Sequence, residues 1–239
     1  MHNFFNNNGL PINDIDFSNI TDAPLIITIG RQLGSGGREI GKIIAKALNM
    51  PYYDKEILDC AARDSGFAPE FFERSDERKG FFQTLFSNNE PMLGHATAFY
   101  QNQMSDDHLF RLQADTIRRI AAQHVGGVFI GRCADYVLRD YPNCLNIFIS
   151  ANIDERTEAL MKRKNIEREA ALKLLSKGDN RRAEYYNYYA SGKWGTASNY
   201  DLCINASYLG IEGTAQSILE FVERLTINEV RDESLEMRV

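Results

Sequence analysis

Apolar runs along the chain alternate with helically spaced segments and predict strands separated by helices. Residues 24–30, PLIITIG, form a short β-branched run of the kind found in strands buried on both faces. The next segment, residues 36–50, carries its apolar side chains at helical spacing before Pro51 stops it. Residues 51–54, PYYD, then predict a brief second strand that ends at Asp54.

The same two patterns recur through the rest of the chain. Further strands are expected at residues 128–131 (VFIG), 145–150 (LNIFIS) and 200–207 (YDLCINAS). Helices are expected from a cap at Ser105 through residue 124, and at residues 134–140, 152–164, 166–177 and 213–225. Strands that alternate with helices predict an α/β fold of three layers, with a mostly parallel central sheet.

One domain, residues 24–226, accounts for this alternation, and the segments around and within it differ in composition. Residues 1–23 form a polar, asparagine-rich extension, and residues 227–239 form a charged tail that is expected to fray. Residues 55–104 mix aromatic, charged and turn-forming residues, which indicates helical insertions outside the sheet. A chain of 239 residues can bury a full hydrophobic core in one such domain.

Composition narrows the classes of function. The chain has 44% hydrophobic and 25% charged residues, and no apolar run approaches the ~18 to 20 residues that span a bilayer. Its start has neither region of a signal peptide, so we expect a cytoplasmic protein without a membrane role. The net charge of −6 disfavours generic binding to nucleic acid. The four cysteines and four histidines lack the spacing of a disulfide framework or a zinc site.

Residues 30–41, GRQLGSGGREIG, join the first strand to the first helix and predict a phosphate-binding turn. The first N–H groups of a helix lack partners within it and lie at its positive end, so they bind anions where glycines allow close approach. The standard P-loop, G-x-x-x-x-G-K-[ST], is not matched, because Gly36 or Gly37 stands where lysine belongs. We expect Arg38 to supply the missing cation and Glu39 to hold Mg²⁺ directly or through water. The predicted phosphate-binding residues are Gly34, Ser35, Gly36, Gly37, Arg38 and Glu39.

Two other interpretations of this turn remain open at the level of sequence. Asp54 lies 20 residues after Gly34, where a dinucleotide-binding fold has its ribose-binding acid, although Glu39 replaces the third glycine of that fingerprint. The glycines could also serve only the geometry of a tight strand-to-helix turn. Phosphate binding is favoured over a purely structural role for the glycines.

Three longer segments give the chain a family resemblance. They contain the turn G-S-G-G-R-E-I-G, the sequence G-R-C-A-D at residues 131–135, and the run R-x-x-Y-Y…W…Y-D-L-x-I-N that begins at Arg182. In this order they cover most of residues 25–225 and resemble the cytidylate kinase-like family, relatives of the P-loop nucleoside monophosphate kinases. The resemblance implies a P-loop kinase fold with a helical acceptor-binding insertion at about 55–104 and a mobile helical lid at about 152–195.

The resemblance also implies roles for individual residues. Residues 34–38 would cradle the phosphates of ATP, and Asp54 would contact the sugar of the acceptor nucleotide. Arg132 and Asp135 would contact the acceptor's phosphate and base region. Arg156, Arg163 and Arg182 would be the arginines of the lid, although helix-surface ion pairs of Arg156 and Arg163 with Glu155 or Glu167 are a bland alternative.

The physical chemistry of phosphoryl transfer supports these roles for the turn, the arginines and the lid. Phosphoryl transfer requires alignment, cations on the phosphate oxygens and exclusion of water, which arginines and a closing lid can supply. Arg132 is favoured because a cation after a buried strand, at the carboxyl edge of the sheet, is placed for ligand binding. The aromatic group at residues 185–194 is assigned to packing rather than to base stacking.

The predicted function is therefore transfer of a phosphoryl group from ATP, with Mg²⁺, to a small nucleotide, with CMP or dCMP as the first candidate. The catalytic residues would be Arg38, Arg132, Arg156, Arg163 and Arg182. The missing lysine leaves a second hypothesis, a nucleotide-binding or regulatory module without catalysis. A third, weaker hypothesis is an NAD-dependent oxidoreductase.

Overall fold

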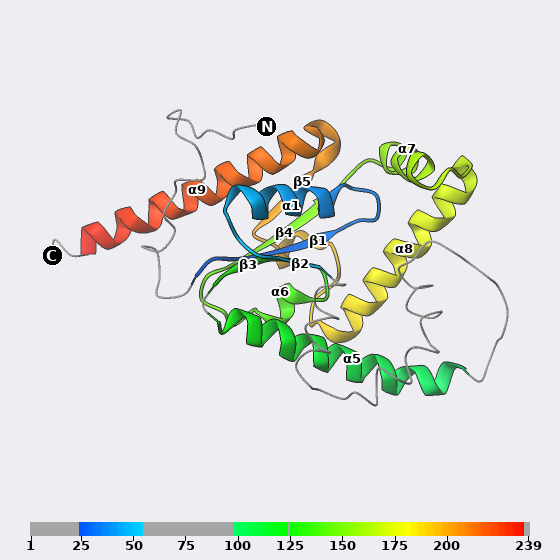
Figure 1. The fold of residues 1–239 in the computed structure, drawn as a ribbon, viewed down its shortest axis with the longest axis horizontal. Coiled ribbons are helices and arrows are strands. Elements are labelled where there is room, and N and C mark those ends of the chain that lie inside the picture. The colour runs from blue at the N-terminus through cyan, green and yellow to red at the C-terminus, as the bar shows by residue number, and fades with distance from the viewer. Residues whose placement is uncertain (1–23, 55–97, 124, 237–239) are drawn as a thin grey trace.

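The computed structural model describes residues 24–54, 98–123 and 125–236 (Figure 1). The polar extension at 1–23, residues 55–97 of the expected insertion and the last three residues of the tail lie outside this part of the chain. The described segments form helices packed on both faces of one sheet, which confirms the predicted α/β architecture.

Five parallel strands form this sheet in the order β2-β3-β1-β4-β5. The strands are β1 (Ile26–Arg31), β2 (Tyr52–Tyr53), β3 (Gly127–Ile130), β4 (Cys144–Ser150) and β5 (Leu202–Asn205). β1 lies at the centre, with Ile29 paired to Ile130 on one side and to Ile147 on the other. Because β1 is covered on both faces, its apolar residues need no polar alternation, as the sequence indicates.

Helices cover the two faces of the sheet separately (Figure 1). α1 (Gly37–Ala47) and α9 (Gly210–Glu236) pack on one face, where Ile40, Ile44 and Ile218 are fully buried. α5 (Ala98–Ala121) and α6 (Ala134–Val137) pack on the other face. The three predicted layers are thus present, with the core on each side of β1, β3 and β4.

Two further helices lie beside the edge of the sheet where β1 ends (Figure 1). α7 (Ile153–Lys164) follows β4, and the long α8 (Arg168–Tyr189) runs from α7 toward α5 and α6. Two short 3-10 helices, Ala197–Asn199 and Ala206–Tyr208, flank β5. α7 and α8 occupy residues of the expected lid and border the end of β1.

Some predicted boundaries are wrong. α5 begins at Ala98, so Ser105 lies inside the helix and does not cap it. α8 continues to Tyr189 rather than ending at 177. α9 continues to Glu236, so residues 227–236 are helical rather than frayed, consistent with the lack of glycine and proline after Gly213. No helix of the described segments is long and apolar enough to cross a membrane.

The sheet order contradicts the dinucleotide-binding interpretation. In that fold the strand after the first helix pairs directly with the first strand. Here β3 lies between β1 and β2. Asp54, which follows β2, therefore does not take the position of a ribose-binding acid beside β1.

Candidate functional site

The turn between β1 and α1 has the geometry of an anion-binding loop. Gly34 and Gly36 adopt positive φ angles of 80° and 77°, which other residues rarely adopt, and Gly36 immediately precedes the first residue of α1. The Ser35 side chain donates a hydrogen bond to the carbonyl of Gln32, at 3.0 Å, and so closes the turn from within. The first-turn N–H groups of α1 consequently face the space beyond the end of β1.

A cavity of about 340 Å³ opens in front of this turn, and we call it the loop cavity. Residues 31–39 line it together with residues of α7 and α8. Four arginines but only two glutamates contribute to its wall: Arg31, Arg38, Arg163 and Arg182, with Glu39 and Glu155. The loop cavity therefore carries an excess of positive charge on a protein whose net charge is −6.

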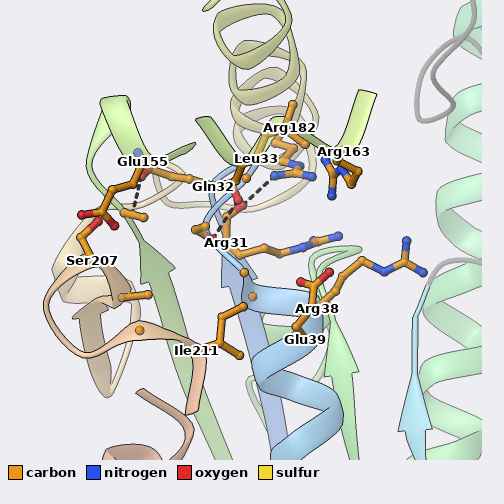
Figure 2. A pocket seen from close by; sticks show the side chains of 18 residues that line it. Arg31, Gln32, Leu33, Arg38, Glu39, Glu155, Arg163, Arg182, Ser207 and Ile211 are labelled. Carbon is orange, nitrogen blue, oxygen red and sulfur yellow. Dashed lines mark hydrogen bonds between the residues drawn. The ribbon is translucent and has the colours of Figure 1, made fainter. Parts of the chain in front are cut away.

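Three of these arginines point toward the same space. Figure 2 shows the Arg31, Arg163 and Arg182 side chains converging beyond the N-terminal end of α1. Arg182 also donates a hydrogen bond to the carbonyl of Arg31, at 3.0 Å. Burial and the neighbouring arginines lower the pKa of Arg31 well below its ordinary value, and burial lowers the pKa of Arg182 to about 10. Both guanidinium groups stay charged at neutral pH, so their mutual repulsion favours a bound anion.

Arg38, the predicted substitute for lysine, lies differently. Its guanidinium forms an ion pair with Asp54, 2.5 Å away, and its side chain turns away from the other arginines (Figure 2). The Asp54 side chain is 9% exposed, whereas that of Arg38 is 46% exposed. The structure thus brings two predicted site residues together, but as partners of each other at the border of the loop cavity.

Arg156, a predicted lid arginine, is buried under the turn rather than placed in the loop cavity. It donates to Asp179 of α8, at 2.5 Å, and to the carbonyl of Leu33, at 3.2 Å. Asp179 also accepts a hydrogen bond from the Leu33 N–H, at 2.7 Å. The alternative of a surface ion pair with Glu155 or Glu167 is therefore wrong for Arg156, which instead fixes the turn against α7 and α8.

A second, smaller cavity of about 50 Å³ lies beyond β3, and we call it the aromatic cavity. Arg132 and Asp135, the predicted acceptor-binding residues, both line it, and so does Arg182. Arg182 belongs to both walls, so the two cavities meet at this side chain. The structure thereby places the glycine-rich turn and two predicted acceptor-side residues, Arg132 and Asp135, on either side of one arginine, whereas the third, Asp54, lines neither cavity.

Asp135 is held in the aromatic cavity by a tyrosine of α8. The Tyr186 hydroxyl donates a hydrogen bond to the Asp135 carboxylate, at 2.7 Å. Burial nevertheless raises the pKa of Asp135 above its ordinary value. The same burial, with the Asp135 charge nearby, raises the pKa of Tyr186, which keeps the hydroxyl protonated as a donor.

Most of the aromatic residues at 185–194 pack against neighbouring side chains, which is the role that the sequence analysis assigns to them. Tyr186 is buried, and Tyr185, Tyr189 and Trp194 are partly buried around it. Tyr189 stacks on Phe110 of α5 with ring centroids 4.0 Å apart. Tyr188 differs, since it is 66% exposed. These contacts fasten the C-terminal half of α8 to α5 and α6.

One carboxylate of the loop cavity is the predicted ligand for Mg²⁺. Glu39 lies in the first turn of α1 and lines the loop cavity. No group of three or more metal-ligating side chains occurs among the described residues. Mg²⁺ commonly binds through one or two carboxylates, water and substrate phosphates, so a single glutamate beside a phosphate site fits this ion.

Sequence reasoning missed Arg31 and Asp179. Arg31 ends the central buried strand at its carboxyl edge, the same signal that favoured Arg132, and it stands inside the quoted glycine-rich segment. Asp179 carries no comparable signal, because its partners Leu33 and Arg156 belong to distant segments.

The chain is similar to known proteins in sequence and in structure. The family model described as the cytidylate kinase-like family matches residues 26–208. A cytidylate kinase from Methanocaldococcus jannaschii is 27% identical over 204 residues, which cover 84% of this chain and 99% of that protein. A solved structure of an uncharacterized protein from Eubacterium ventriosum has a TM-score of 0.64 and 27% identity, and covers 84% of this chain and 99% of its own. The family match includes the turn and every arginine of the two cavities.

Proposed function

The chain belongs to the cytidylate kinase-like family, and on this premise we propose that it transfers the γ-phosphoryl group of ATP to a small acceptor, with CMP or dCMP as the first candidate. The ATP phosphates bind in the loop cavity, and the acceptor phosphate binds in the aromatic cavity beside Arg132. The observation that carries this proposal is the position of Arg182 in the walls of both cavities. A cation at this border can contact the phosphoryl group before and after transfer.

On the donor side, the chain supplies charge and orientation. The N–H groups at the start of α1 bind phosphate oxygens, and Arg163 and Arg182 neutralise charge on the phosphoryl group in transit. Glu39 would hold Mg²⁺. When bound, Mg²⁺ neutralises negative charge on the β- and γ-phosphates.

On the acceptor side, a monophosphate needs no general base. Its second pKa is about 6, so its oxygen is ionised at neutral pH. This oxygen bonds to the γ-phosphorus while the bond from that phosphorus to the β–γ bridging oxygen breaks, which leaves ADP and a diphosphate product. Arg132 binds the acceptor phosphate, and Asp135 accepts hydrogen bonds from the base region. Asp54 contacts the sugar in this proposal.

Residues 152–195, which contain α7 and α8, act as the lid. The aromatic cavity holds about 50 Å³, whereas pockets for small ligands usually measure about 300–1,000 Å³. Acceptor binding therefore requires the tyrosines of α8 to move away from Arg132. Return of these tyrosines then excludes water from the transferred group.

A second function is favoured by one observation. Glycine occupies position 37, the first residue of α1, where a P-loop kinase carries its lysine. A chain that binds ATP but cannot align transfer would serve as a nucleotide-binding or regulatory module.

A coupled assay of ADP release with Mg²⁺, ATP and each of CMP, dCMP, UMP, AMP and GMP tests the proposal. We expect turnover with at least one pyrimidine monophosphate. Arg182→Gln should lower kcat by about 10² to 10³-fold, because a preorganised cation on the transferred group is lost. Arg181→Gln, one residue along α8 and outside both cavity walls, is the matched control and should stay within a few-fold of wild type.

Two results would decide against transfer to a nucleotide. Absence of turnover with all five acceptors would reject the named substrate class. ATP binding by calorimetry without product would favour the regulatory module instead.

A further inference from the structure

Position 37 shows what fills the place of the missing lysine. A Cβ atom added to Gly37 would lie 2.7 Å from the Arg31 Cβ and 2.9 Å from its Cγ. Carbon atoms of real side chains do not approach so closely. The stem of Arg31 therefore runs through the space that a side chain at the first position of α1 would occupy, and glycine at 37 is what leaves this path open.

The guanidinium of Arg31 continues from there toward the end of β3, the strand beside β1. A Cβ atom added to Gly131 would lie 1.8 Å from the Arg31 Nη1, so the group rests directly over the backbone at the end of β3. Gly131 lines the aromatic cavity, and Arg31 lines the loop cavity. Two glycines from distant segments thus leave room for one arginine at the border of the two cavities.

The charges around Arg31 are mostly of its own sign. Arg182, Arg132 and Arg38 each disfavour its protonated form, and burial does so more strongly. Its buried Nε has no hydrogen-bond partner among the described residues. A partly buried cation that faces other cations is costly unless an anion joins it. Arg38 differs, because Asp54 already neutralises it.

From these contacts we infer that Arg31, and not Arg38, supplies the cation that binds the β- and γ-phosphate oxygens of the donor. This inference rests on the proposed function for the identity of the donor. It replaces the sequence-based assignment of the lysine's role to Arg38. The planar guanidinium can bind two phosphate oxygens at once, which suits a group that must hold the donor beside the acceptor.

Calorimetric titration with inorganic tripolyphosphate tests the inference without requiring catalysis. Arg31→Gln keeps most of the side-chain stem and removes the charge, and we expect it to weaken binding by about tenfold or more. Arg38→Gln, the matched variant, should weaken binding by less than about threefold, because its charge is already paired with Asp54. Equal affinity of Arg31→Gln and wild type, or a larger loss in Arg38→Gln, would overturn the inference.

A second variant guards against misfolding of Arg31→Gln, which thermal unfolding would reveal. Gly131→Ala keeps every charge but displaces the Arg31 guanidinium, and because Gly131 has a φ of 69° that strains alanine, thermal unfolding of this variant is measured as well. It should also weaken tripolyphosphate binding, and unchanged affinity would count against Arg31. If wild type binds tripolyphosphate through Arg31 yet phosphorylates no nucleotide, the inference stands and the proposed transferase fails. If wild type phosphorylates a nucleotide, and Arg31→Gln matches wild type in turnover and in affinity for tripolyphosphate, the proposed transferase stands and the inference fails.

Discussion

Arg132 and Cys133 both have left-handed backbone conformations, with φ angles of 60° and 53°, directly after Gly131 at 69°. Each such non-glycine residue costs about 1 kcal/mol or more. The turn places the Arg132 side chain in the wall of the aromatic cavity and buries Cys133 against Tyr186. Strain kept at the edge of a candidate site is consistent with selection for the position of Arg132 rather than for stability.

Asp135 makes a prediction about pH. Burial raises its pKa above the ordinary 3.8, so the folded chain holds this proton more tightly than the unfolded chain does. Its contribution to stability is therefore fully present below pH 3.8 and is lost as the pH rises through the raised pKa. Asp135→Asn can still accept the Tyr186 hydrogen bond but has no charge to bury.

Urea unfolding of wild type and Asp135→Asn, over a series of pH values, measures this effect. Wild type should lose stability relative to the variant as the pH rises above about 4, the ordinary aspartate value. A difference between the two proteins that stays constant with pH, or that grows in favour of wild type, would contradict the assignment.

At the scale of individual residues, the sequence predicts only part of the site. The run GRQLGSGGREIG predicts a phosphate-binding turn without lysine, because helix N-termini and glycines have local signatures. It does not identify which arginine compensates. That depends on the path of Arg31 between Gly37 and Gly131, and Gly131 comes from a strand about a hundred residues away.

At the scale of elements, the connection between the turn and α8 determines how the loop cavity is built. Asp179 accepts from Leu33 and Arg156, and Leu33 packs so closely on Gly178 that an added Cβ there would lie 2.6 Å from it. α8 therefore cannot move away from the turn without breaking these contacts. We regard Asp179 as the residue that ties the proposed lid to the phosphate turn.

Asp179→Asn should lower the free energy of unfolding by about 3 kcal/mol, because it leaves the Arg156 charge without its partner in a buried position. Asp154→Asn is the control, since its pair with Arg168 is largely exposed and is worth less than about 1 kcal/mol. Chemical denaturation compares the two. Similar losses in both variants would show that the Asp179 pair contributes no more than a surface contact.

Gly178 also explains why the predicted end of α8 is wrong. The helix predicted at 166–177 ends one residue before Gly178, and glycine lowers helix propensity by about 1 kcal/mol. Gly178 is instead inside α8, where Leu33 leaves no room for a side chain. The strands and α1 were predictable, because buried parallel strands and amphipathic helices have local patterns. Contacts between distant elements have none.

At the scale of the whole molecule, the order of the strands places the two cavities side by side. β1 lies between β3 and β4, so Arg31 at the end of β1 and Arg132 just after β3 lie at the same edge of the sheet. α8 closes this edge with Arg182. The sequence indicates a parallel sheet but not this order, because continuous apolar strands carry no record of their neighbours.

The central claim is that donor phosphates bind between the start of α1 and the arginines of the loop cavity. A crystal structure of the protein with Mg²⁺ and a non-hydrolysable ATP analogue tests it most directly. We predict the β- and γ-phosphates in front of α1, with the Arg31 and Arg182 guanidinium groups about 3 Å from their oxygens. Phosphates bound elsewhere, or held only by Arg38, would contradict this account.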